Sequence, residues 1–217
     1  MHRFIKNHWV AWIRLKHHLW RVWWKKRDQL LGGRRRLSAG ERALHQAVST
    51  GNVQNVEILL LRGANANLRG SYDMPLLMLA ASAGHREIVR LLLQAGAQVD
   101  ASNPSTQHTA LMFAAKNGHC ATMALLLSYG ANIEAANRAG TTALLAATLA
   151  GQTEAVQFLL QEYAARRIRP GQERVALGAA KKYGFQEIVA LLKQDSSPPM
   201  SKQSGDESVS ELKERTT

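Results

Sequence analysis

Few residues in this 217-residue chain combine the types and the spacing that catalysis needs. The single cysteine, Cys120, directly follows His119, and a Cys–His pair is the usual start of a nucleophilic site. Neighbouring residues on a helix point apart, however, so this spacing argues against a reacting pair. We interpret Cys120 as a small packing residue and expect no catalytic residue at this position.

The sequence also lacks the motifs that bind phosphate-containing cofactors or zinc. Gly32 and Gly33 are followed by arginines, and not by the spaced Gly-Lys-Ser/Thr of a phosphate-binding loop. A single cysteine supplies neither paired zinc ligands nor an internal disulfide, which fits a reducing compartment. We therefore expect no cofactor, no metal and no enzymatic activity.

A fivefold repeat organises the middle of the chain. Glycines recur at intervals of 33 or 34 residues, with a leucine seven residues before each glycine and an alanine four residues before it. A fixed period of this length is typical of stacked helical hairpins. The glycines are Gly51, Gly84, Gly118, Gly151 and Gly184, the leucines are Leu44, Leu77, Leu111, Leu144 and Leu177, and the alanines are Ala47, Ala80, Ala114, Ala147 and Ala180.

Each unit predicts two short antiparallel helices that meet at the repeat glycine. Small alanines on the first helix let neighbouring units approach closely, and the second helix presents Val, Met and Leu to the core. Gly63, Gly96 and Gly130 suit a left-handed turn that ends the second helix. Ser38 with Glu41 matches a capping box, so the stack is expected to begin near Ser38.

These residues resemble the ankyrin repeat family. Residues 75–85 have the sequence PLLMLAASAGH and residues 109–119 have TALMFAAKNGH, and the resemblance extends over 41–193. It implies an all-α ankyrin-repeat solenoid of helix-turn-helix units with protruding turn fingers. It also implies a structural role for His85 and His119, because the family commonly has His there. The expected repeats are about 41–70, 71–104, 105–138, 139–171 and 172–194, the last a degenerate cap, and Tyr163 replaces the usual glycine in the fourth.

Charge and composition divide the chain into three parts. Residues 1–36 hold eleven Lys or Arg, one acid and all five tryptophans, so the rest of the chain contributes only +2 to the formal net charge of +12. Residues 37–194 form the expected ankyrin repeat domain. Residues 195–217 are rich in Ser, contain Pro198 and Pro199, and are expected to be disordered.

The basic, Trp-rich segment 1–36 predicts an amphipathic helix. On a helical wheel its bulky apolar residues share one broad arc and most of its cations lie opposite, although Lys16 falls within the apolar arc. Cations interrupt every apolar run, which argues against a secretory signal and a transmembrane span. The expected anchor residues are Arg3, Lys6, Trp9, Trp12, Arg14, Trp20, Arg21, Trp23, Trp24 and Lys25.

Four roles compete for this segment: binding an anionic membrane surface, covering the end of the first repeat, docking in a partner's groove, and contacting nucleic acid. Membrane binding ranks first, because Trp prefers the interface and each cation near anionic lipid contributes about 1 kcal/mol. Nucleic acid ranks last, because the charge lies on a short segment and not across a folded face. The basic clusters 25–27 and 34–36 also resemble a nuclear address.

The resemblance implies that the first helices and the fingers form a protein-binding surface. The expected contact residues are Arg69, Tyr72, Asp73, Met74, Asn103, His108, Arg138, Arg167 and Arg169. We predict a cytoplasmic, non-enzymatic adaptor that is a monomer outside its complex and binds one or more proteins. Residues 1–36 are expected to anchor it peripherally at an anionic membrane surface or on a second partner. The alternative is a nuclear or nucleic-acid-associated regulator that uses residues 1–36 as address or contact.

Overall fold

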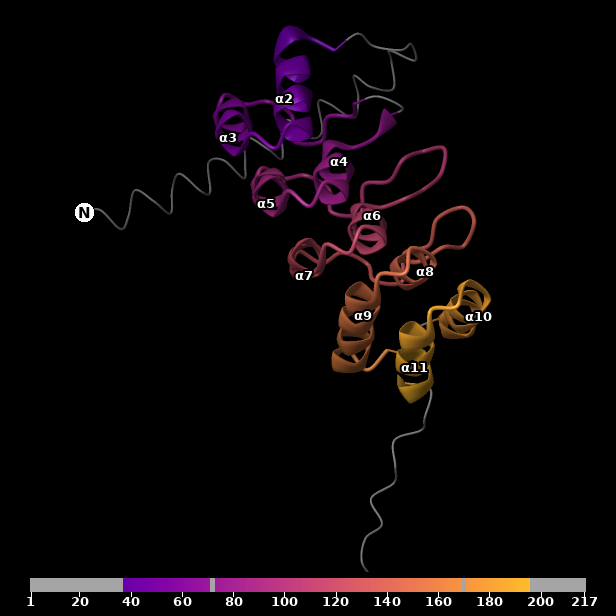
Figure 1. Ribbon diagram of the computed structural model, residues 1–217. Helices are drawn as coiled ribbons and strands as arrows, with labels where there is room; N and C mark the ends of the chain where they lie inside the picture. Colours follow the sequence, from indigo (N-terminus) through magenta and orange to yellow (C-terminus); the bar gives the residue numbers. More distant parts are fainter. Residues whose placement is uncertain (1–36, 71–72, 169–170, 196–217) are drawn as a thin grey trace, which may run out of the picture.

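The computed structural model describes residues 37–70, 73–168 and 171–195, which form five stacked helical hairpins (Figure 1). The first helices of the five units are α2 (Ala39–Ser49), α4 (Leu76–Ser82), α6 (Ala110–Lys116), α8 (Ala143–Leu149) and α10 (Glu173–Tyr183). The second helices are α3 (Val53–Leu61), α5 (Arg86–Gln94), α7 (Cys120–Ser128), α9 (Thr153–Ala165) and α11 (Gln186–Asp195). Over these ranges the only β-pairing is an isolated bridge between Arg69 and Pro75, so the expected all-α solenoid is confirmed.

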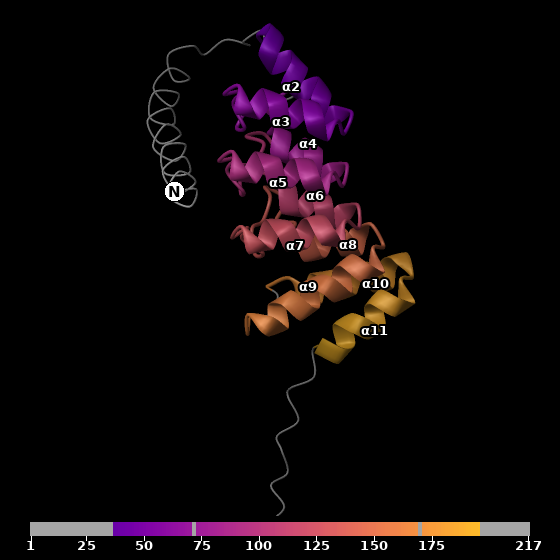
Figure 2. The same ribbon diagram turned by 90° about the vertical axis from the view of Figure 1, so that its left-hand side faces the viewer.

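The helices form two rows. Successive first helices pack side by side, and α3, α5, α7 and α9 lie one after another in the second row (Figure 2). The loops that lead into α4, α6 and α8 project from the first-helix side of the stack (Figure 1). The two rows therefore present different surfaces, and the fingers, meaning these projecting loops, border only the first-helix row.

The capping box predicted at the start of the stack is present. The hydroxyl of Ser38 accepts a hydrogen bond from the Glu41 amide at 3.2 Å, and the Glu41 carboxylate accepts one from the Ser38 amide at 2.8 Å. An N-cap of this kind is worth about 1 kcal/mol, because it satisfies amides that have no partner within the helix. The limits predicted for the domain as a whole stay predictions.

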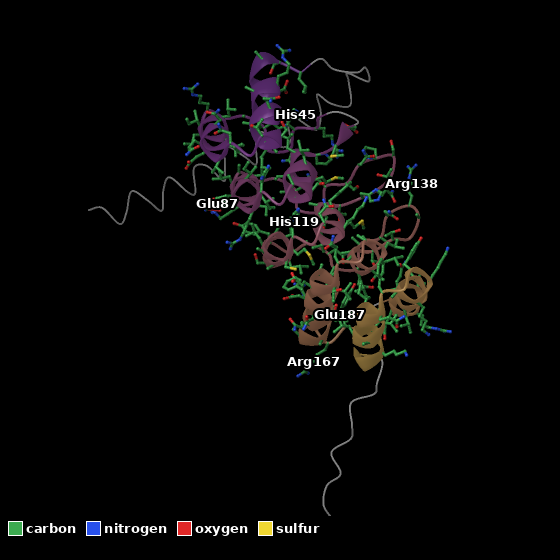
Figure 3. The ribbon with its side chains drawn as sticks, viewed as in Figure 1. His45, Glu87, His119, Arg138, Arg167 and Glu187 are labelled. Carbon is green, nitrogen blue, oxygen red and sulfur yellow. The ribbon has the colours of Figure 1, made fainter. Side chains whose placement is uncertain are left out.

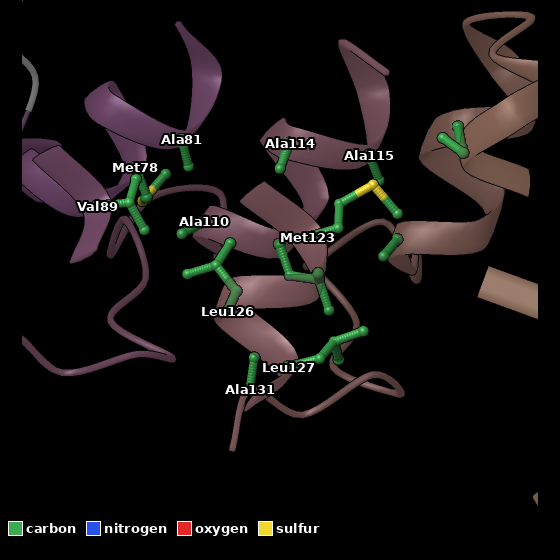
Figure 4. Packing of buried hydrophobic residues seen from close by; sticks show 14 of the residues in the cluster. Met78, Ala81, Val89, Ala110, Ala114, Ala115, Met123, Leu126, Leu127 and Ala131 are labelled. Atoms are coloured by element: carbon green, nitrogen blue, oxygen red, sulfur yellow. The ribbon is translucent and has the colours of Figure 1, made fainter. Parts of the chain in front are cut away.

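The core lies between the two rows and runs through all five units. The repeat leucines Leu44, Leu77, Leu111 and Leu144 are at most 1% exposed, and the repeat alanines beside them are also buried. Figure 4 shows Met78 and Val89 of the second unit facing residues of the third unit, among them Ala110 and Leu126. Each unit thus buries part of its apolar surface against the next, as a solenoid requires.

His119 joins the third unit to the second. The ring lies against Gly84, which has a φ of +71°, and a Cβ added there would be 2.8 Å from two ring atoms. The ring Nε2 lies 3.1 Å from the carbonyl oxygen of Ser82, and the Asn117 side chain donates to the same oxygen at 2.7 Å. The geometry therefore gives His119 a packing partner and a hydrogen-bond partner in the preceding unit.

Tyr163 changes the end of the fourth unit. Gly96 and Gly130, at the equivalent position, adopt positive φ and end their helices, whereas Tyr163 remains helical because its Cβ disfavours that conformation. Helix α9 consequently has 13 residues where α5 and α7 have 9, and the left-handed residue is Arg167 with a φ of 56°. The buried Tyr163 hydroxyl donates to the Ile133 carbonyl at 3.2 Å.

Candidate interaction surface

Metal-ligating side chains do not cluster in the described part of the chain. Among residues 37–70, 73–168 and 171–195, no group of three His, Cys, Asp or Glu side chains could hold a metal ion. Cys120 is half-buried, and burial raises the pKa of its thiol, which disfavours the nucleophilic thiolate. None of the helices in these ranges has the length and apolar run that crossing a bilayer requires.

Hydrogen bonds join each finger to the next part of the stack. The Asn67 side chain donates to the Gly96 carbonyl at 3.0 Å and accepts from the Gln98 amide at 2.8 Å. The Asp100 carboxylate accepts from the Asn132 amide at 3.1 Å. Because these bonds run between units, the fingers form one continuous border and not separate loops.

Two of the predicted contact residues hold the fingers in shape. The Arg69 guanidinium donates to the carbonyls of Asp73 and Ser102, both at 3.0 Å, and so bridges two fingers. Asn103 is only 8% exposed, and its side-chain oxygen accepts from the amides of Ser105 and Thr106 at 2.8 and 3.2 Å. Much of the hydrogen-bonding capacity of both side chains is therefore used within the stack.

His108 is held in its neutral form by the next finger. The Asn137 side-chain oxygen accepts from the amides of Ala139 and Thr141, so its NH₂ group must face His108, where the two nitrogens lie 3.0 Å apart. An NH₂ group only donates, so the His108 Nε2 must accept and carry no proton. Burial lowers the pKa of His108, and the charge of Lys116 lowers it further.

The remaining predicted contact residues differ in exposure. Asp73, Arg138 and Arg167 are exposed, whereas Met74 is half-buried against the core. Figure 3 places Arg138 on a projecting finger, on the opposite side of the stack from Glu87. Tyr72, Arg169 and the anchor residues of 1–36 lie outside the described residues. The contact roles of all these residues stay predictions.

Sequence reasoning missed a line of side chains on the first helices. These residues precede each repeat glycine by two positions, and we call them the inner row: Ser49, Ser82, Lys116, Leu149 and Lys182. All are exposed except Ser82, which is half-buried, and Leu149 has 44% of its surface exposed. The repeat register contains the signal: the first helices were expected to take part in binding, but the contact residues named from the sequence all lie on the fingers.

Comparison with known proteins agrees with this architecture. A family model described as ankyrin repeats (3 copies) matches residues 27–103, 44–137, 77–169 and 111–206, which together cover most of the chain. The chain is similar to Protein phosphatase 1 regulatory subunit 27 of Homo sapiens and of Mus musculus, at 38% identity over 65 residues in each case. The match covers 30% of this chain and 42% of each relative, which is less than half of their length.

Proposed function

Because this chain belongs to the ankyrin repeat family, we propose that it is a non-enzymatic adaptor whose stack of hairpins binds a protein partner. One observation carries the proposal: the fingers are hydrogen-bonded into a continuous border beside an exposed first-helix row. A preorganised surface loses little freedom when it binds, so more of the contact energy appears as affinity. The relatives support the proposal, because their name describes a regulatory subunit.

The partner-binding proposal is tested by affinity capture with the full chain, followed by cross-linking and mass spectrometry of the complex. We expect cross-links to the fingers and the first helices, including Arg138 and Lys182. Capture with a chain lacking residues 1–36 serves as the control and should retain the same protein. Cross-links confined to the second helices, such as Lys193 on α11, would contradict the proposed surface.

We further propose that residues 1–36 attach the adaptor to an anionic membrane surface. Their eleven cations favour anionic lipid, and their five tryptophans favour the boundary between headgroups and acyl chains. Attachment of this kind would hold the bound partner near the membrane without a spanning helix.

Tryptophan emission tests the membrane proposal cleanly, because every tryptophan lies within residues 1–24. The full chain is titrated with vesicles of phosphatidylserine and phosphatidylcholine, and with vesicles of phosphatidylcholine alone as the control. We expect a blue shift with the anionic vesicles that is lost in about 1 M salt, where the Debye length falls to about 3 Å. No shift with anionic lipid would overturn the proposal.

The same measurement addresses coverage of the first unit by residues 1–36. Ile58 and Leu61 on α3 are 46% and 70% exposed, and Leu61 stands where the next two units have Gln94 and Ser128. If residues 1–36 covered these side chains, the emission would already be blue-shifted without vesicles. Leu61→Glu would then shift the emission to the red, which would favour coverage over membrane attachment.

A further inference from the structure

The first-helix row carries positive charge that the described acids do not balance. Helices α4, α6 and α8 contain no Asp or Glu, and the acids of α2 and α10, Glu41 and Glu173, lie in the first turn. Glutamates occur on the second helices α3, α5, α9 and α11. Lys116 and Lys182 are exposed, and neither pairs with a carboxylate within the described ranges.

Leu149 stands between these two lysines. Helix α8 packs between α6 and α10, so Leu149 lies between Lys116 and Lys182 along the inner row. It is the one apolar member of that row, since the first two units have Ser49 and Ser82. A lone exposed leucine is ordinary on a protein surface. Leu149 differs because the equivalent positions of the units on both sides have Lys116 and Lys182, which form no ion pair within the described ranges.

The last unit presents an exposed aromatic side chain beside Lys182. Tyr183 follows Lys182 and is 55% exposed, with the Lys182 ammonium 5.7 Å from its ring centroid. Tyr and exposed aliphatic side chains supply apolar contact area, whereas lysines at the border orient a charged partner.

Each of the two fingers that lead into α6 and α8 has an acid that accepts a hydrogen bond from a backbone amide. The Asp100 carboxylate accepts from the Asn132 amide at 3.1 Å, and the Glu134 carboxylate accepts from the Gly171 amide at 3.3 Å. The exposed Arg138 projects from the finger that leads into α8 and adds positive charge beside the first-helix row (Figure 3).

We propose that Lys116, Leu149, Lys182 and Tyr183, together the inner patch, bind an acidic peptide segment of the partner protein. An apolar side chain of the segment packs on Leu149 and Tyr183, and carboxylates on either side lie beside the two lysines. This inference rests on the protein-binding function proposed above and specifies the chemistry of the partner.

The arrangement favours an acidic peptide over a nucleic acid. A phosphate backbone needs a continuous line of cations, because each neutralised phosphate contributes to its affinity. Here Leu149 separates the two lysines, so a phosphate placed over Leu149 would have no cation to contact. A peptide that alternates acidic and apolar residues satisfies all three positions.

A displayed library of random dodecapeptides, sorted on the full-length protein, tests the inference. Selected clones are then measured against K116E/K182E and against R86E/K193E, a control that places the same charge change on exposed residues of α5 and α11. We expect a population of clones, enriched in Asp and Glu around an apolar residue, that loses about tenfold or more in affinity for K116E/K182E only. Leu149→Ser introduces the residue of the first two units and should weaken the same clones. Circular dichroism verifies the fold of each variant.

Three results would overturn the inference. The first is the absence of any clone that depends on Lys116 and Lys182. The second is dependence on these lysines without an excess of acidic residues. The third is binding that appears only after residues 196–217 are deleted, which would mean that the protein's own tail occupies the patch. If cross-linking still maps a captured partner to the fingers, these results refute the inner patch and leave the adaptor function standing.

Discussion

The contact between Gly84 and His119 gives the sharpest prediction about the stack. Gly84→Ala places a methyl group 2.8 Å from the His119 ring, well inside the normal contact distance. Gly96→Ala is the matched control, because Gly96 belongs to the same unit, has a φ of +86° and has no neighbouring atom within 4 Å of the added Cβ. Both variants strain the backbone, but only the first disturbs the joint between two units.

The magnitudes follow from the geometry. An alanine forced into the left-handed region costs about 1–2 kcal/mol, which both variants should show. In the native protein the His119 Nε2 lies 3.1 Å from the Ser82 carbonyl oxygen. In Gly84→Ala the ring must move away from this oxygen, and losing the hydrogen bond costs about 0.5–1.5 kcal/mol. These two costs give about 1.5–3.5 kcal/mol for Gly84→Ala, and any overpacking that remains adds to that sum.

Urea unfolding of the full chain, followed by circular dichroism, measures both free energies. We expect Gly84→Ala to be the less stable variant by at least about 1 kcal/mol, because only it loses the His119 contact. Removing the ring with His119→Ala should bring the additional cost of Gly84→Ala down to that of Gly96→Ala, as a double-mutant cycle would show. Equal destabilisation by Gly84→Ala and Gly96→Ala would refute the view that His119 joins the units.

Three further predictions address the fingers, the fourth unit and the start of the stack. Because the folded-state pKa of His108 is lowered, neutral His108 stabilises the fold fully above pH 6.5, and this stabilisation is lost as the pH falls toward the lowered pKa. His108→Gln should therefore remove the decrease of the urea midpoint over this pH range. Tyr163→Phe loses the hydrogen bond to the Ile133 carbonyl and should cost about 1 kcal/mol in the same unfolding assay, with a larger loss pointing to a packing change. Ser38→Ala removes the capping hydroxyl and should cost about 1 kcal/mol, and unchanged stability in thermal unfolding would show that the cap contributes nothing.

The repeat register was sufficient to predict the fold. Leucine and alanine at fixed offsets from a glycine specify which face of each helix is buried, and Leu77 and Ala80 are indeed at most 1% exposed. The effect of Tyr163 was harder to foresee. Its departure from glycine was visible in the sequence, but the end of α9 at Ala165 and the hydrogen bond from the Tyr163 hydroxyl to the Ile133 carbonyl were not.

The candidate surface was less predictable than the fold. The bond from Arg69 to the Ser102 carbonyl in the next unit depends on the three-dimensional path of the fingers. The Asn103 side chain instead accepts from amides two and three residues further along the chain. Lys116 and Leu149 were within reach of sequence reasoning, because their positions follow from the register. Their exposure and the lack of acids beside them became evident only when the helices were placed in rows.

Hydrogen–deuterium exchange of the full chain, with and without a captured and purified partner, tests the central claim most directly. The stack is expected to bind that partner through its fingers and first helices, so protection should appear in residues 65–70, 100–108 and 134–141 and at the ends of α6, α8 and α10. Helices α3, α5 and α7 should exchange as before. Protection confined to residues 1–36 or to the second helices would contradict the claim that the stack is a protein-binding scaffold.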